Sequence, residues 1–303
     1  MKATKPLVGS GAAESAAAKE VRCPVCDSRD PHIFVTGERD YGREIIRSFG
    51  FYLCPKCRLR FQLVGDDEAT TLFADVQESA ARSRPSARRE LRCDEDVLRC
   101  MQGMSSGRRL FEIGPGDGRF LAAARNHGFD CLGLDVSEGL AQSAAARAQV
   151  QVMVGKLTEV DVPGGPFDWV NLDQVLMYVP NPQPFMQKVF ELMRPGGICR
   201  IRENNPDSVL ARLHGKRYWM YSPTHVAVWA ERTVRLLAEK TGLRIMRVIP
   251  GSECSLANWQ ASSRRSTFST KIKDTAFYLI RKTRLLGISL AADTVYYLRR
   301  PEN

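Results

Sequence analysis

The chain has 303 residues, of which 44% are hydrophobic and 26% are charged. These proportions are those of a globular protein and exclude a disordered chain. No run of about 18 uninterrupted apolar residues occurs, so we expect no membrane-spanning helix. The net charge of +10 favours either an anionic partner or a surface charged for solubility.

Residues 1–20 are rich in Ala, Gly and Lys and lack the apolar segment of a secretion signal. We therefore expect a flexible tail here and a cytoplasmic protein with reduced cysteines.

Two CxxC pairs follow the tail. They are Cys23, Cys26, Cys54 and Cys57. Four thiolates suit tetrahedral zinc, and the intervening segments 33–35 and 49–53, with 59–63 after the second pair, are strand-like. The pattern predicts a zinc ribbon over residues 21–66 with a structural metal, because protein ligands fill all four positions. A redox CxxC pair and a grip on nucleic acid are the alternatives.

Residues 67–107 are predicted to form a helical linker or lid. A helical stretch opens at Asp66, Pro85 interrupts it, and helical spacing of apolar residues resumes at Leu91. The arginines between residues 82 and 89 form either an anion clamp over a cleft or a solvated linker.

A glycine-rich loop opens the main domain, which is predicted over residues 108–303. A buried strand at 110–113 leads into Gly114-x-Gly116-x-Gly118, and a helix follows at 120–125. Glycines there permit a tight turn and a close approach of the backbone to a ligand. A dinucleotide-binding loop would have its third glycine at position 119, but that position holds Arg119.

Strands and helices alternate beyond this loop. The strands are predicted at 129–135, 150–154, 167–172, 198–203 and 243–249, and the helices at 137–148, 182–193 and 231–241. This order is typical of a parallel α/β sheet. Asp135 ends the second strand, where a carboxylate can accept both hydroxyls of a ribose.

The run Glu112-x-Gly114-x-Gly116-x-Gly118, together with Asp135 and the Arg194-Pro195-Gly196-Gly197 turn, resembles class I S-adenosylmethionine-dependent methyltransferases. With the double CxxC, it is similar to the branch that carries an N-terminal zinc-binding domain and acts on sugars and natural products. The resemblance spans residues 21–250. It implies a Rossmann-like, mostly parallel seven-stranded sheet whose last strand, 292–299, is antiparallel, with residues 250–291 as an insertion.

The resemblance also implies the site residues. The glycines would pass under the methionine part of S-adenosyl-L-methionine, Glu112 would support the loop, and Asp117 would lie near the cofactor amine or ribose. Asp135 would hold the ribose, and Leu157 would offer a backbone contact to the adenine. Asp173 and Gln174 would face the methionine end.

Two positions depart from the family pattern. Where the family has an acid that meets the adenine amino group, Gly155 is followed by Lys156. Where it has Glu-His after the fourth strand, this chain has Met177 and Tyr178. The candidate catalytic residues are therefore His225, between the fifth strand and the next helix, and Tyr178, each with core packing as its alternative.

The insertion at 250–291 is basic and amphipathic. Residues 264–290 would contact either an anionic membrane or a lipid-linked substrate, or would simply cover the pocket. The expected function is methyl transfer from S-adenosylmethionine, by in-line displacement, to a small-molecule acceptor: a sugar, a natural product or a lipid-linked, anionic metabolite. The alternatives are an RNA methyltransferase, against which the lack of interleaved basic and aromatic residues argues, and a non-catalytic binding protein.

Overall fold

The computed structural model describes residues 20–40, 46–70, 87–251, 253, 275, 276, 278, 279, 282–285 and 288–302. The expected tail, the arginines at 82 and 84, and most of the basic insertion lie outside the described residues. Within the described ranges, no helix has both the length and the apolar composition needed to cross a bilayer.

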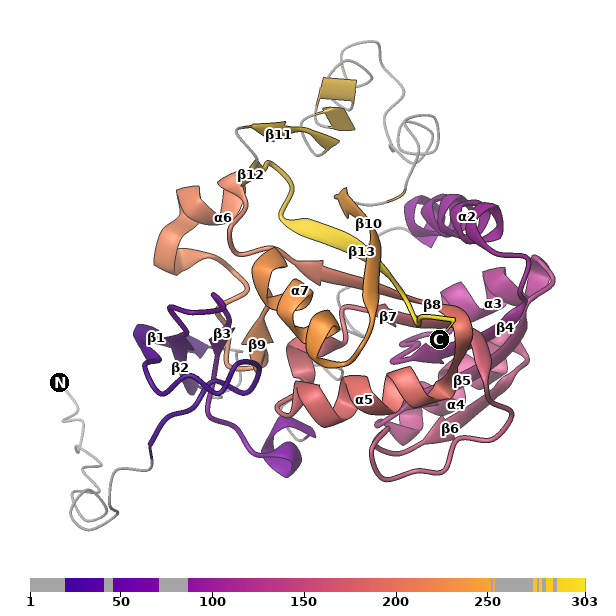
Figure 1. Ribbon diagram of the computed structural model, residues 1–303, viewed down its shortest axis with the longest axis horizontal. Helices are drawn as coiled ribbons and strands as arrows, with labels where there is room; N and C mark the ends of the chain where they lie inside the picture. The colour runs from indigo at the N-terminus through magenta and orange to yellow at the C-terminus, as the bar shows by residue number, and fades with distance from the viewer. Residues whose placement is uncertain are drawn as a thin grey trace, which may run out of the picture.

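A seven-stranded sheet forms the centre of the molecule (Figure 1). Its strands in spatial order are β10 (Arg244–Pro250), β13 (Asp293–Arg299), β8 (Met193–Asn204), β7 (Phe167–Asp173), β4 (Arg109–Ile113), β5 (Asp130–Asp135) and β6 (Gln151–Val154). The pairs from β8 to β6 are parallel, whereas β13 runs antiparallel to both β8 and β10. The predicted fold class is confirmed, including the antiparallel last strand.

Helices cover both faces of this sheet. On one face lie α2 (Ala87–Met104), α3 (Arg119–Asn126) and α4 (Glu138–Ala148), and on the other lie α5 (Pro182–Leu192) and α7 (Glu231–Lys240). Successive residues of β4 point to opposite faces, so Leu110 joins the buried cluster under α2 and α3 while Phe111 joins the cluster under α5 and α7. Because both faces are covered, the central strands β4, β5 and β7 bury most of their residues.

The N-terminal module is a small antiparallel sheet. Its strands are β1 (His32–Asp40), β2 (Ile46–Leu53), β3 (Arg60–Phe61) and β9 (Ala227–Val228), in that order. The strand β9 comes from the main domain and pairs with β3, so the two parts share one sheet. Phe61 and the cysteines of the module also belong to the same buried cluster as Phe111.

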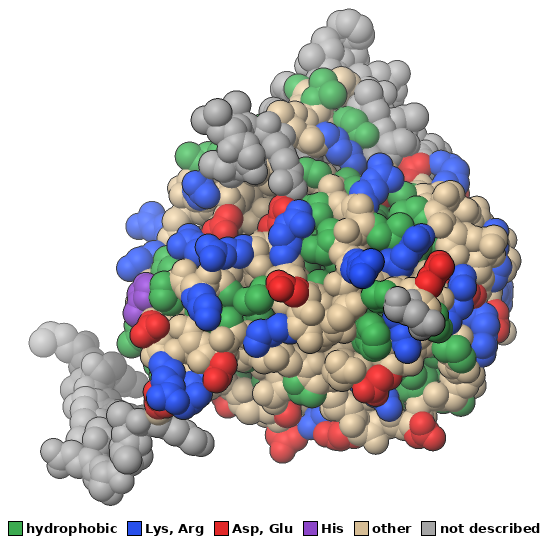
Figure 2. Space-filling model, viewed as in Figure 1, with side chains coloured by type: hydrophobic (Ala, Val, Ile, Leu, Met, Phe, Trp, Pro, Cys, Tyr) green, Lys and Arg blue, Asp and Glu red, His purple; other side chains and the backbone are tan. Residues whose placement is uncertain are grey.

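Two short helices, α6 (Val209–His214) and η2 (Gly215–Arg217), project beside this module. Their surface is basic, and Figure 2 shows Lys and Arg side chains over it. Arg212, Lys216 and Arg217 are exposed there, and the neighbouring Leu213 is 80% exposed. A two-stranded ribbon of β11 (Arg284–Leu285) and β12 (Ile288–Ser289) lies in the insertion.

Candidate functional site

Four thiols converge in the N-terminal module. The Sγ atoms of Cys23, Cys26, Cys54 and Cys57 all lie within 4.8 Å of one another. Two of the separations are 3.5 Å (Cys23 to Cys57) and 3.4 Å (Cys26 to Cys54). Tetrahedral zinc with Zn–S bonds of about 2.3 Å would need sulfurs about 3.8 Å apart, so the cluster fits this ion with small adjustments.

The two CxxC segments fold into matching knuckles. In each, the residue after the second cysteine donates its backbone N–H to the carbonyl of the first cysteine at 2.9 Å, from Asp27 to Cys23 and from Arg58 to Cys54. Asp27 and Arg58 both adopt positive φ. Backbone N–H groups also point at the sulfurs of Cys23 and Cys57. This arrangement stabilises thiolates, which are the form that binds metal.

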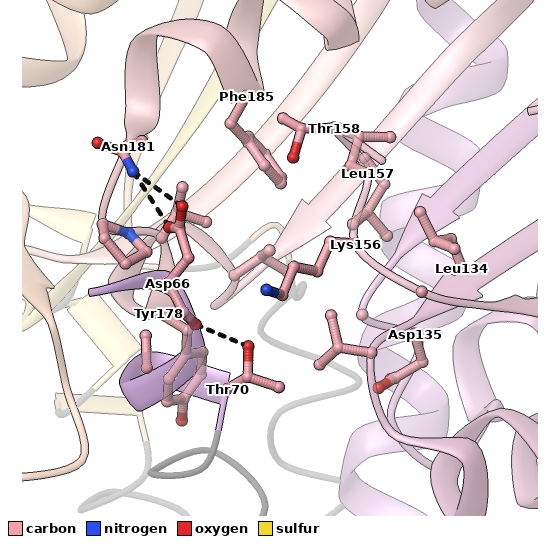
Figure 3. Close-up of a pocket in the computed structure, with 18 of the residues that line it drawn as sticks. Asp66, Thr70, Leu134, Asp135, Lys156, Leu157, Thr158, Tyr178, Asn181 and Phe185 are labelled. Atoms are coloured by element: carbon pink, nitrogen blue, oxygen red, sulfur yellow. Dashed lines mark hydrogen bonds between the residues drawn. The ribbon is translucent and has the colours of Figure 1, made fainter. Parts of the chain in front are cut away.

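A cavity of about 460 Å³ opens at the carboxyl ends of β4, β5, β6 and β7. It lies where ligands bind in open α/β sheets. Among the predicted site residues, it brings together Gly114, Gly116, Asp135, Leu157, Asp173, Gln174 and Tyr178. We call this cavity the cleft (Figure 3).

The glycine loop forms the floor of the cleft. Gly116 has a φ of +57°, and a Cβ added there would meet nothing within 4 Å, so its open side is available to a ligand. Gly118 has a φ of +74°, but its Cβ would lie 2.5 Å from the Cα of Ala144. Its absent side chain therefore allows α3 to pack against α4.

Asp135 ends β5 with its carboxylate in the cleft. The side chain is buried, and Oδ1 accepts a hydrogen bond of 2.9 Å from the backbone N–H of Ser137. The other oxygen, Oδ2, is also buried and accepts no hydrogen bond of good geometry among the described residues, although the backbone N–H groups of Gly116 and Val136 point toward the carboxylate. Burial raises the pKa of Asp135 to about 6. An unsatisfied buried carboxylate oxygen is costly unless a ligand donates to it.

The loop after β6 forms one side of the cleft through Gly155, Lys156, Leu157 and Thr158. Figure 3 shows the amine of Lys156 directed into the space between Asp66 and Asp135. Lys156 Nζ donates to Asp67 Oδ1 at 2.8 Å. The cation that replaces the family's acid is thus paired with a carboxylate from another segment.

Three consecutive residues at the end of β8 hold the loop after β7. Arg202 contacts the Asp173 carboxylate at 3.2 Å, and Asn204 donates to the side-chain carbonyl of Gln174 at 2.5 Å. Between them, the buried Glu203 carboxylate accepts the backbone N–H groups of Leu176 and Met177. The loop that carries Asp173, Gln174 and Tyr178 is therefore positioned by one strand.

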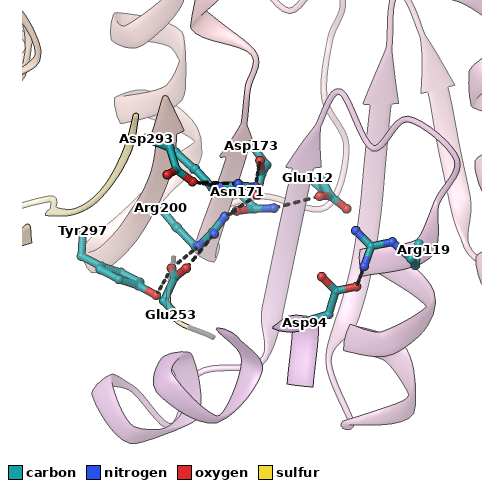
Figure 4. A network of polar contacts seen from close by, with 10 residues as sticks. Asp94, Glu112, Arg119, Asn171, Asp173, Arg200, Glu253, Asp293 and Tyr297 are labelled. Atoms are coloured by element: carbon teal, nitrogen blue, oxygen red, sulfur yellow. Dashed lines mark hydrogen bonds and ion pairs between the residues drawn. The ribbon is translucent and has the colours of Figure 1, made fainter. Parts of the chain in front are cut away.

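A network of buried charges lies behind Asp173 (Figure 4). Arg200 and Arg202 alternate along β8 on the face that also carries Asn171 and Asp173 of β7, because these residues are register partners. Arg200 contacts Asp173 at 3.1 Å and Glu253 at 2.7 Å. Burial opposes ionisation of Asp173, but the two guanidinium charges lower its pKa overall. Asp173 thus presents a carboxylate to the cleft.

The two candidate catalytic residues are neighbours. The Tyr178 ring, which lines the cleft, meets the His225 ring edge-on with centroids 5.8 Å apart. His225 lies behind it, outside the described lining of the cleft, with Nδ1 2.9 Å from the carbonyl of Met220. A carbonyl can only accept, so Nδ1 carries the proton. Burial lowers the pKa of His225 to about 4, so its imidazole is neutral at pH 7 and weakly basic.

Three predicted cofactor residues stand outside the described lining of the cleft. The buried Glu112 accepts a hydrogen bond of 2.8 Å from Asn171, and burial raises its pKa to about 8. Asp117 forms an ion pair of 2.6 Å with Arg147. With Gly118 against Ala144, these residues support the loop and its helices.

Several lining residues were not anticipated from the sequence. They are Asp66, Ala69, Thr70, Ile113, Leu134, Val136, Thr158, Val175, Val179, Asn181, Pro184 and Phe185. Most flank the predicted strands and could have been found by extending each strand end by a few residues. Asp66, Ala69 and Thr70 come from a helical turn far away in the sequence, at the start of the segment predicted as a helical linker or lid. No local pattern indicates which of its residues reach the cleft.

Comparison with known protein families finds a match over the main domain. A model described as a methyltransferase domain matches residues 86–248, which is more than half of the chain. A ubiquinone biosynthesis O-methyltransferase of Psychrobacter arcticus is 27% identical over 123 residues, which cover 37% of this chain and 48% of the relative. The chain therefore spans about half the length of the curated relatives it matches.

Solved structures show the same fold. A SAM-dependent methyltransferase from Archaeoglobus fulgidus has a TM-score of 0.52 at 18% identity, covering 75% of this chain and 99% of that one. The N-methyltransferase NodS from Bradyrhizobium japonicum, solved with S-adenosyl-L-homocysteine, has a TM-score of 0.51 at 15% identity, covering 76% and 99%. At this identity the likeness concerns the fold alone.

Proposed function

Because the chain belongs to the methyltransferase-domain family, we propose that it transfers a methyl group from S-adenosylmethionine to a hydroxyl group of a small molecule. The observation that carries this proposal is the cleft. It combines a glycine floor, the unsatisfied Asp135 Oδ2 and the ionised Asp173 along one line of strand ends.

The residues present fit this cofactor. Gly116 leaves room for the methionine chain, and Asp135 Oδ2 offers the acceptor that a ribose hydroxyl needs. Asp173 offers a negative charge where a cationic amine or sulfonium would be stabilised. These three residues would hold the two ends of the molecule while the loop at 155–158 contacts the base.

When bound, the cofactor supplies an electrophilic methyl group on a sulfonium. The chain then has to hold the acceptor oxygen in line and exclude water, which is catalysis by orientation. Tyr178 lines the cleft and carries a hydroxyl, and we assign it the role of orienting the acceptor through a hydrogen bond. His225, neutral and behind Tyr178, would stabilise the position of that ring and is too weakly basic to remove a hydroxyl proton efficiently.

The hydroxyl acceptor rests on the curated relatives, which are named as O-methyltransferases of ubiquinone biosynthesis. An aromatic cluster borders Tyr178 and contains Phe34, Phe51, Tyr218 and Tyr221. These four residues belong to, or pack on, a buried cluster and do not line the described cleft, so they support the Tyr178 ring from behind.

A labelling experiment tests this function. The purified protein is incubated with methyl-labelled S-adenosylmethionine and a cell extract, and the products are separated into lipid-extractable, nucleic-acid and small water-soluble fractions. We expect label in the lipid-extractable or small-molecule fraction, as a base-stable ether. Label in RNA would favour the nucleic-acid alternative, and no transfer to any fraction would contradict the proposal.

We further propose that the four cysteines bind structural zinc. The sulfur spacing and the matching knuckles support this assignment. All four positions would be filled by protein, so the ion would order the module and would not meet substrate.

A further inference from the structure

The cleft has a wall that the main domain does not supply. The strand ends, the loops after them and the start of α5 supply most of its lining, and the rest consists of Asp66, Ala69 and Thr70. These residues belong to one helical turn, residues 66–70, which we call the cap turn. Figure 3 shows the cap turn facing Asp135 across the cleft.

The cap turn is attached to both rims of the cleft. On one rim, Asn181 Nδ2 donates to both carboxylate oxygens of Asp66, at 3.1 and 3.0 Å. On the other rim, Lys156 Nζ contacts Asp67 Oδ1 at 2.8 Å. These contacts join the loop after β7 and the loop after β6 through the cap turn, so its position determines the width of the cleft.

In the chain, the cap turn directly follows the N-terminal module. Between Cys57 and Asp66, several contacts anchor the chain to the main domain, and three of them involve the backbone of this segment. Thr233 Oγ1 donates to the carbonyl of Cys57 at 2.7 Å, Arg60 in β3 pairs with Val228 in β9, and Gln62 N donates to the carbonyl of Val226 at 2.8 Å. One continuous segment thus holds both the second knuckle and the start of the cap turn against the main domain.

We infer that the cap turn is part of the binding site for the adenosyl ligand, and that the N-terminal module, folded around its proposed metal, holds it there. The inference rests on the proposed function, because it concerns the same cleft. A preorganised wall saves the ordering cost of closing the site, so metal loading raises the affinity for the ligand without a metal–ligand contact. Asp67 and Lys156 form the attachment on the adenosine side, and Asp66 and Asn181 form the other.

The test measures binding of S-adenosyl-L-homocysteine by titration calorimetry at low salt. Asp67→Lys and Lys156→Met, which adds no acid near the adenine, are each expected to weaken binding about two- to fivefold, the range of one exposed ion pair. In the double variant, Lys156→Met removes the like-charge repulsion that Asp67→Lys creates, so the two losses should not add. Glu68→Lys is the matched control, because it makes the same charge change on the same turn. Glu68 is exposed and does not line the described cleft.

Two further measurements separate the cap turn from general damage to the fold. Asp66→Ala should weaken binding about tenfold, because it removes a charged hydrogen bond at a lining residue. The protein should keep its zinc and its melting temperature. Removing the metal from the wild-type protein with a chelator should weaken binding at least as much, and adding zinc back should restore it.

The outcomes distinguish this inference from the proposed function. If the wild-type, zinc-loaded protein does not bind S-adenosyl-L-homocysteine, both fail together. If it binds, but with an affinity that neither the Asp66 and Asp67 variants nor the chelator changes, the cap turn is not part of the site and this inference alone is overturned.

Discussion

The cluster of four cysteines, which we propose as a metal centre, and the cleft are built in opposite ways. Each half of the cluster is a CxxC segment with its own hydrogen-bonded turn, and the two turns match in their hydrogen bonds and in the positive φ after the second cysteine. The cleft is assembled from four strand ends, the loop before α5 and the cap turn, and its members are as far apart as Asp66 and Phe185. A site made of local units is robust to its surroundings, whereas a site made of distant segments depends on the whole fold.

The largest expected effect is at the metal centre. Cys54→Ser should abolish stoichiometric zinc binding and unfold the N-terminal module, because structural zinc contributes on the order of 10 kcal/mol to small domains. Elemental analysis and thermal melting by circular dichroism would measure this. Cys131→Ser, at a free cysteine outside the cluster, is the control and should keep its zinc. Full zinc content in the Cys54 variant would contradict the assignment of the four cysteines as a zinc site.

Asp135→Asn should be the most damaging polar change in the cleft. A charged acceptor is replaced by a neutral one at a buried position, so we expect binding of S-adenosyl-L-homocysteine to weaken about 10- to 100-fold, the worth of one to two charge-assisted hydrogen bonds. The melting temperature should not fall, because the variant also loses a buried, incompletely paired charge. Asp161→Asn, at an exposed acid, should bind like the wild type. Equal affinity in both variants would contradict the role of Asp135.

Two glycines of the same loop should respond differently. Gly118→Ala places a methyl group against the backbone of Ala144 and should lower the stability by about 1–3 kcal/mol, the usual cost of overpacking. Gly116→Ala meets no protein atom within 4 Å, so its larger effect should be on ligand binding. Urea unfolding and calorimetry on both variants would show this. The comparison breaks if the Gly116 variant is the less stable one and binds normally.

Binding should also depend on pH through Asp135. Its pKa in the free protein is raised to about 6 by burial, and hydroxyl donors from a ribose favour the ionised form, so the pKa falls in the complex. Affinity should therefore be constant above pH 7 and should decrease below pH 6, by at most about tenfold per pH unit. Titration calorimetry from pH 5 to 8 measures the profile, and the Asp135→Asn variant should flatten it. An affinity of the wild-type protein that does not change with pH would contradict this prediction.

Tyr178→Phe should have the smallest effect. Removing one orienting hydroxyl should lower kcat about tenfold or less and leave the affinity for S-adenosyl-L-homocysteine unchanged, because only the acceptor end of the cleft is altered. Turnover of the acceptor found by labelling gives kcat, and calorimetry gives the affinity. A kcat loss of a thousandfold or more would instead identify the Tyr178 hydroxyl as a base in the reaction.

Local patterns explain the parts that were predicted well. The alternation of strands and helices and the double CxxC depend on residues close in sequence, so a parallel α/β sheet and the cysteine cluster were both expected. The number of seven strands and the antiparallel last strand were implied by the family resemblance. Asp135 and the glycine loop could be located because a parallel strand delivers its last residue to the ligand edge of the sheet. The pairing of β3 with β9 was not foreseen, since a two-residue strand has no periodicity.

By itself, the sequence determined the two kinds of site. One is a cluster of four thiols on two short turns, and the other is the ligand-binding edge of the sheet, formed by strand ends. Only the tertiary structure decided how these sites meet. It placed His225 behind Tyr178, turned Gly118 toward Ala144, and brought Asp66 and Asp67 to the rims of the cleft. The physical reason is that contacts between distant segments depend on how sheets and helices pack, and packing leaves no periodic signal in the chain.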